Sequence, residues 1–190
     1  FLRLAQSAGW EVAGVEPDPT SSKHAARTGI DVRPSIGDFG EMAGGFDYVT
    51  VSHVIEHVHD PIETLRQCRR LLRPGGGIYV DTPNIDAIGH RIYGRDWHGL
   101  DPPRHLTLFN RASLLRALGQ AGFARARYRH RPSPFAHVSG RSRRIAAGAD
   151  PYGDETPATL PRAPGALARL RSALARRDAE FLAVTPEVPR

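Results

Sequence analysis

Residues 46–61 constrain the fold more than any other stretch, because an apolar run leads directly into titratable side chains and then into a helix start. Residues 46–52 are largely apolar and rich in β-branched side chains, as in a parallel strand buried on both faces. Asp60, Pro61 and Glu63 then give the cap, first helical position and capping box of a helix. Between strand and helix, where open α/β sheets bind ligands, stand His53, Glu56, His57 and His59.

The rest of the chain continues this alternation of strands and helices. Short β-branched runs ended by Gly, Pro or Asp predict strands, and apolar side chains at helical spacing predict helices. We predict helices at 1–8, 20–28, 61–72, 111–121 and 166–176, and strands at 10–15, 30–34, 46–52, 78–80, 123–131 and 180–185. This pattern predicts an α/β protein with a mostly parallel twisted sheet.

The length of 190 residues suits one domain with a core of its own. No apolar run approaches the length of a membrane span, and no signal peptide is visible. Cys68 is the single cysteine, so an internal disulfide framework is excluded, and its helical spacing with apolar residues predicts a buried thiol. We therefore expect a cytoplasmic protein without a membrane span.

The net charge is +6 and comes almost wholly from arginine, with 25 Arg against one Lys. Residues 102–149 contain ten arginines and no acidic residue. The stretch is compatible with an anion site, but a solvated segment of biased composition is the favoured interpretation. Aromatic residues are not interleaved to stack bases, so we expect no nucleic-acid partner.

Three motifs carry a resemblance to a known family. They are His53-Val-Ile-Glu-His57 followed by Asp60-Pro61, the helix-ending run Leu-Arg-Pro-Gly-Gly at 72–76, and the aromatic segment 97–109. Together they resemble class I S-adenosylmethionine-dependent methyltransferases, in particular the small-molecule O-methyltransferases of the ubiquinone-biosynthesis type. His53 stands where the motif of that family has an acidic residue.

The resemblance implies a Rossmann-like class I fold, with residues 180–185 as an antiparallel edge strand. The chain begins with Phe1 inside a predicted helix, so we expect an N-terminally truncated piece in which the first strand and its glycine-rich loop are missing. We expect a core at 1–131 with a substrate lid at 84–109. Residues 132–164 have few large apolar groups, which predicts a mobile linker, and 165–190 would return to the same domain.

The cofactor implied is S-adenosyl-L-methionine, with no metal expected. Glu16 follows a strand and can accept hydrogen bonds from both ribose hydroxyls. The resemblance places Asp38 on the adenine amino group, with Phe39 supporting the ring. Alternatively, these two are a turn aspartate and a core phenylalanine. Ser52 and His53 would line the methionine part of the cofactor.

Methyl transfer needs an aligned, nucleophilic acceptor, which we expect to be a hydroxyl oxygen on a small molecule. A histidine near the acceptor can take its proton, and we rank His57 before His105, which would come from the lid. Glu56 can orient an imidazole or reach a metal, and the sequence leaves open whether Glu56 and His57 bind one. The sequence leaves the oligomeric state open.

Three other functions remain open at this point. A nicotinamide-dependent Rossmann enzyme shares the ribose carboxylate, but it does not explain the motif of residues 53–61. His53 to His57 formally match an inverted zinc-protease motif, which requires a helix. The domain could also be a non-catalytic scaffold or regulatory domain that has lost cofactor binding.

Overall fold

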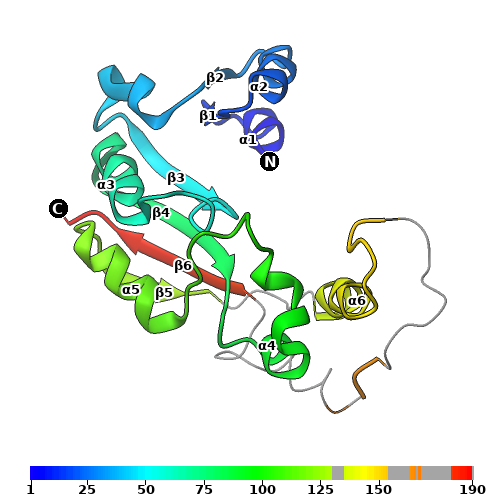
Figure 1. The fold of residues 1–190 in the computed structure, drawn as a ribbon. Coiled ribbons are helices and arrows are strands. Elements are labelled where there is room, and N and C mark those ends of the chain that lie inside the picture. The colour runs from blue at the N-terminus through cyan, green and yellow to red at the C-terminus, as the bar shows by residue number, and fades with distance from the viewer. Residues whose placement is uncertain (130–134, 154–162, 166, 168–180, 190) are drawn as a thin grey trace.

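The computed structural model describes residues 1–129, 135–153, 163–165, 167 and 181–189. It is an α/β structure with two sheets and flanking helices (Figure 1). The helices are α1 (Leu2–Ser7), α2 (Pro19–Ala26), α3 (Pro61–Leu71), α4 (Ile88–Tyr93), α5 (Arg111–Gln120) and α6 (Phe135–Ala146), with 3-10 turns η1 (Ile36–Met42), η2 (Gly94–Asp96) and η3 (His98–Leu100). The strands are β1 (Ala13–Val15), β2 (Asp31–Arg33), β3 (Phe46–Ser52), β4 (Leu72–Pro83), β5 (Ala124–Tyr128) and β6 (Phe181–Glu187).

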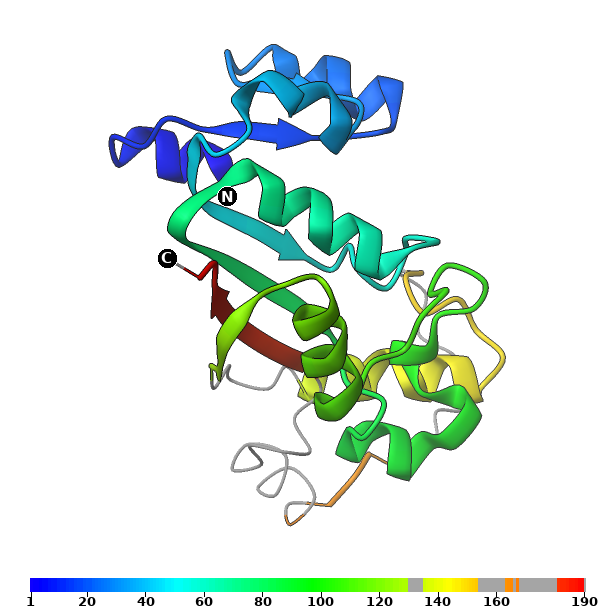
Figure 2. The same cartoon turned by 90° about the vertical axis from the view of Figure 1, so that its left-hand side faces the viewer.

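The N-terminal unit contains a small parallel sheet in which β1 pairs with β2, with Gly14 opposite Val32. Figures 1 and 2 place this unit beside β3, and Figure 2 draws β1 and β3 pointing the same way. Among the described strands, β1 pairs only with β2, and β3 pairs only with β4. The absence of a first strand and of a glycine-rich loop stays a prediction.

The larger sheet has the order β3-β4-β6-β5. β3 and β4 are parallel, whereas β6 is antiparallel to both β4 and β5. The direction of β6 agrees with the sequence prediction, but its expected position at the sheet edge is wrong. Val184 pairs with Val80 on one side and with Tyr128 on the other, and it is fully buried. An apolar strand of this kind is stabilised in the sheet interior, so β5 lies at the edge.

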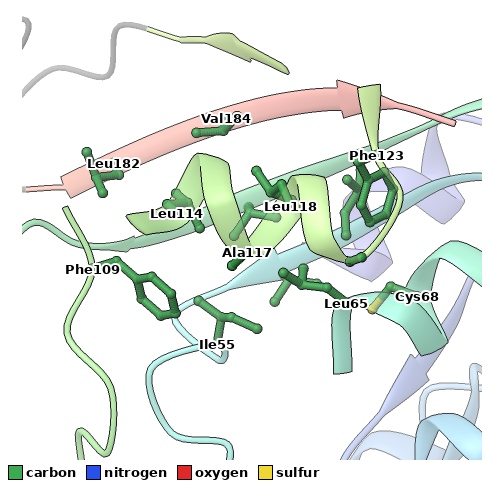
Figure 3. Packing of buried hydrophobic residues seen from close by; sticks show 14 of the residues in the cluster. Ile55, Leu65, Cys68, Phe109, Leu114, Ala117, Leu118, Phe123, Leu182 and Val184 are labelled. Carbon is green, nitrogen blue, oxygen red and sulfur yellow. The ribbon is translucent and has the colours of Figure 1, made fainter. Parts of the chain in front are cut away.

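The main core lies between this sheet and helices α3 and α5 (Figure 3). α3 begins as predicted, with Pro61 in its first turn and the Asp60 carboxylate accepting a hydrogen bond of 2.9 Å from the Glu63 amide. Its apolar face buries Leu65 and Cys68 against the cluster. The helix therefore fixes where the preceding histidine-containing turn leaves the sheet.

Residues 84–109 form a second packed region with α6. The Tyr93 hydroxyl is 2.6 Å from the Ser139 hydroxyl, and the His98 amide donates to Ser142 Oγ over 2.9 Å. Trp97 and Val138 are buried together in a small apolar cluster. The role of this region as a substrate lid stays a prediction.

Helix α6 lies inside the stretch 132–164, which the sequence predicts to be a mobile linker. For residues 135–146 that prediction is wrong, because Phe135 and Val138 are buried and Ser139 and Ser142 pack closely against the 84–109 region. The small hydroxyl side chains of Ser139 and Ser142 make packing contacts here without the large apolar groups that usually anchor a helix. The predicted helix at 166–176 lies almost wholly outside the described residues.

No helix in the described part of the chain combines the length and apolar character needed to cross a bilayer.

Candidate functional site

The turn after β3 holds the first group of titratable side chains. His53 has a φ of +53°, which turns the chain sharply at the strand end, and the His57 amide donates to the Val54 carbonyl over 2.9 Å. Residues 53–57 thus form a turn and not a helix. The inverted zinc-protease motif requires two histidines on one helical face, so this geometry does not provide it.

Glu56 is the most enclosed carboxylate of the site, with 0% of its surface exposed. Its Oε1 is 3.2 Å from His53 Nδ1, and its Oε2 accepts from the Thr82 hydroxyl over 3.0 Å. Burial acts to raise the pKa of Glu56, but the hydrogen bonds from His53, its own backbone and Thr82 outweigh burial and lower the pKa below its ordinary value. Glu56 is therefore a buried carboxylate held in its charged form.

His57 and His105 face each other across the site, with ring centroids 4.8 Å apart. His57 Nδ1 lies 2.9 Å from the Arg104 carbonyl oxygen, and His105 Nδ1 lies 2.9 Å from the Gly99 carbonyl oxygen. A carbonyl oxygen only accepts, so each Nδ1 carries the proton in these bonds. In the neutral form, Nε2 of each ring is then left with a free lone pair.

These side chains line a cavity of about 350 Å³ at the carboxyl ends of β3 and β4. The β3 turn contributes His53, Glu56 and His57, and the strand ends contribute Pro83 and Phe181. The opposite walls come from the 84–109 region and from α6 and the turn after it, as Trp97, His98, Gly99, Asp101, Arg104, His105, His137, Val138, Arg141 and Tyr152. We call this space the histidine cavity.

Three of the lining residues also form a group of potential metal ligands. One ligand atom from each of Glu56, His57 and His105 lies within 4.8 Å of the others. Two imidazoles and a carboxylate suit several divalent metals. The sequence prediction that the site holds no metal stays a prediction.

The sequence patterns did not reveal the wall of the cavity that contains Arg141 and Tyr152. Arg141 lies with its guanidinium 4.4 Å from the centroid of the Tyr152 ring, and its Nη1 donates to His98 Nε2 over 3.1 Å. Burial lowers the pKa of His98 to about 4, and the charge of Arg141 adds to this effect. The acid-free run at 102–149 was a signal for this wall, but it did not single out Arg141 among ten arginines.

The predicted cofactor residues lie outside the histidine cavity, except His53. Glu16 follows β1 directly, and its Oε1 accepts from the Asp18 amide over 3.0 Å. Ser52 ends β3, with its hydroxyl 3.5 Å from Asp81. Glu16 and Ser52 therefore lie at the carboxyl ends of strands that point the same way (Figure 2).

Asp38 and Phe39 follow β2 within η1. The Asp38 carboxylate accepts from the Ser35 amide over 2.9 Å, which makes it part of a capping box. Phe39 is 2% exposed, packs edge-on against Phe46, and lies beneath the Arg33 guanidinium. These are the contacts of a capping aspartate and a core phenylalanine, the alternative left open by the sequence.

The family model described as a methyltransferase domain matches residues 1–126. A ubiquinone biosynthesis O-methyltransferase of Caulobacter vibrioides is 48% identical over 69 residues, which cover 34% of this chain and 27% of that protein. The chain thus spans only about a quarter of the length of this curated relative.

Solved methyltransferases share the fold at low sequence identity. An S-adenosylmethionine-dependent methyltransferase of Thermotoga maritima, described as a possible histamine N-methyltransferase, has a TM-score of 0.59 and 18% identity, covering 97% of this chain and 76% of its own. The Burkholderia thailandensis 1,6-didemethyltoxoflavin-N1-methyltransferase, solved with 1,6-didemethyltoxoflavin and S-adenosylhomocysteine, has a TM-score of 0.53 and 15% identity over 99% of this chain and 65% of its own.

The matched residues include both strands of the small sheet, the β3 turn with its histidines, and the 84–109 region. The α/β structure with its mixed sheet is consistent with the Rossmann-like class I fold, and the solved neighbours are S-adenosylmethionine-dependent methyltransferases. The chain belongs to the methyltransferase-domain family, with the class I fold.

Proposed function

We propose that this chain takes part in methyl transfer from S-adenosyl-L-methionine to a hydroxyl oxygen of a small-molecule acceptor bound in the histidine cavity. The observation that carries this proposal is the facing pair His57 and His105, each fixed as an Nδ1–H tautomer by a backbone carbonyl. Two lone-pair nitrogens at one cavity suit the removal of a hydroxyl proton near neutral pH.

His57 is the proposed base, and Glu56 and His105 assist it. Proton transfer to His57 Nε2 makes an imidazolium, whose Nδ1–H keeps its bond to the Arg104 carbonyl. The buried Glu56 carboxylate lies at the same site and stabilises that positive charge. His105 is the second proposed base. Its Nε2 lies 3.9 Å from the Asp101 carboxylate, which would stabilise the positive charge of a protonated His105.

The cofactor supplies an electrophilic methyl group when it is bound. Glu16 suits the ribose, because one of its oxygens accepts from the Asp18 amide and, in the described part of the chain, the other accepts no hydrogen bond. Ser52 and His53 are proposed to contact the methionine part from the end of β3. Asp38 is proposed to read the adenine amino group with its exposed carboxylate, and Phe39 to support the ring from within the core.

The first experiment is calorimetric titration of the full-length protein with S-adenosylhomocysteine. Glu16→Gln should weaken binding by about tenfold or more, because a charge-assisted hydrogen bond to the ribose is lost. Glu11→Gln removes an exposed carboxylate next to β1 and serves as the matched control. Binding that is equal in both variants would remove Glu16 from the cofactor site.

The second experiment measures methyl transfer from labelled cofactor to a panel of hydroxylated acceptors. His57→Ala should reduce turnover by about 10²-fold or more while the affinity for S-adenosylhomocysteine changes little, since the base acts on the acceptor. His59→Ala, at an exposed position outside the cavity, is the control. Unchanged turnover in His57→Ala would exclude this histidine as the base.

A non-catalytic scaffold or regulatory domain is the alternative. It predicts that the full-length protein binds no S-adenosylhomocysteine. In that case, His57 and His105 would not act as bases in methyl transfer.

A further inference from the structure

Arg141 brings a positive charge to the histidine cavity without a matching carboxylate. Its Nη1 donates to His98 Nε2, a neutral acceptor, and its guanidinium lies over the Tyr152 ring. Among the described residues, it has no acidic group within ion-pair distance. A half-buried arginine normally has such a partner, so this position stands out.

The other charged side chains that line the cavity already have hydrogen-bond or ion-pair partners. Arg104 pairs with Asp101, with Nε 2.9 Å and Nη2 2.5 Å from the same carboxylate oxygen. Glu56 is bound by His53 and Thr82. The formal charges of the lining residues Glu56, Asp101, Arg104 and Arg141 therefore sum to zero, but Arg141, unlike Arg104, has no carboxylate partner in the described part of the chain.

The aromatic neighbour of Arg141 holds it in place. Tyr152 lies against the Arg141 guanidinium, and its hydroxyl accepts from Arg104 Nη2 over 2.9 Å. Two cationic side chains thus fix one ring, and Arg141 donates only one bond to His98 in the described part of the chain. A guanidinium has five N–H donors, so Arg141 keeps donors for a ligand.

We infer that the acceptor bears an anionic group, a carboxylate or a phosphate, which Arg141 binds in the same cavity as the histidine pair. This inference rests on the proposed function, because binding of the anion by Arg141 would orient the hydroxyl of the same acceptor toward His57. A sphere of the cavity's volume would be about 9 Å across, so a one-ring compound with an anion at one end and a hydroxyl at the other suits it. Arginine is well matched to both anions, because its planar fork donates two parallel bonds.

The test compares small probes that differ in charge. Benzoate, phenyl phosphate and the neutral benzamide are titrated into the full-length protein, and binding is followed by calorimetry and by competition with one another. We expect one of the two anions to bind about tenfold or more tighter than benzamide, because a hydrogen bond to a charged group is added. The ranking of benzoate against phenyl phosphate identifies which anion the site takes.

Arg141→Gln should abolish this preference for the anion, whereas Arg116→Gln should keep it. Arg116 is exposed on α5, outside the cavity, so the control makes the same change of net charge. The comparison of probes on the unmodified protein does not depend on whether the Arg141 variant folds. Equal binding of benzamide and both anions to the unmodified protein would overturn the inference.

Titration with S-adenosylhomocysteine in the same samples separates the two proposals. A protein that binds S-adenosylhomocysteine but does not prefer anions retains the proposed function and refutes the anionic acceptor. A protein that prefers anions through Arg141 but binds no S-adenosylhomocysteine retains the anion site and refutes methyl transfer.

Discussion

His98 makes the stability of this protein depend on pH in a way that can be worked out from its surroundings. The imidazole accepts from Arg141 through Nε2, and its burial together with that positive charge disfavours protonation. Asp101 acts in the opposite direction, while His105 and His137 add to the lowering of the pKa of His98 to about 4. The unfolded chain takes up this proton near the ordinary pKa of 6.5.

The direction in which stability changes with pH follows from these two pKa values of His98. Above pH 6.5, His98 is neutral in both states, and its contribution to stability is complete. Between pH 6.5 and 4 only the unfolded state binds the proton, so stability falls as the pH falls. At 1.36 kcal/mol per pKa unit, the total loss is about 3 kcal/mol, of which about 2 kcal/mol is reached by pH 5.

The assay is urea unfolding followed by tryptophan fluorescence, at pH 7 and pH 5, for the unmodified protein and for His98→Gln. Glutamine keeps an acceptor for Arg141 but does not titrate. The difference in unfolding free energy between the two proteins should therefore shift by about 2 kcal/mol in favour of the variant at pH 5. His59→Gln is the control for loss of an exposed imidazole. The reasoning is refuted by a difference that stays constant between the two pH values, or by an NMR titration of His98 near pH 6.5.

Four further predictions test the core, a helix cap and the site. Burial raises the pKa of the Cys68 thiol to about 12, so alkylation by iodoacetamide at pH 8 should require unfolding, and rapid labelling of the native protein would contradict this. Leu65→Ala should lower the unfolding free energy by about 2–5 kcal/mol, as measured by urea unfolding, because this side chain is fully buried in the main core. Asp60→Ala should cost only about 1 kcal/mol, because it removes a single cap on the Glu63 amide. Turnover should survive removal of divalent metals by EDTA, because both Glu56 oxygens already accept hydrogen bonds; a stoichiometric metal in the purified protein would refute this expectation.

The sequence predicted those parts of the fold that depend on local signals. The apolar run of β3 and the Asp60-Pro61 cap of α3 each specify their own element, and the structure has both within a residue of the expected bounds. The same reasoning placed His57 and Glu56 at the end of a strand, where they line the cavity.

Other features depend on partners that are distant in the sequence, and the local pattern did not reveal them. The position of β6 between β4 and β5 is set by pairing on both edges, whereas its residues show only that it is a strand. Helix α6 was not predicted, because its Ser139 and Ser142 find their partners Tyr93 and His98 in the 84–109 region, more than forty residues away in the sequence. Arg141 stands out only when its neighbours His98 and Tyr152 are known.

The internal position of β6 has a consequence for how the protein matures on the ribosome. β5 is joined to the rest of the sheet through β6, which follows it by more than fifty residues. While β6 is still unsynthesised, β4 exposes an unpaired edge of the kind that recruits foreign strands. The nascent chain therefore cannot complete this sheet by folding progressively before β6 is made, and we expect it to need protection from aggregation until β6 emerges.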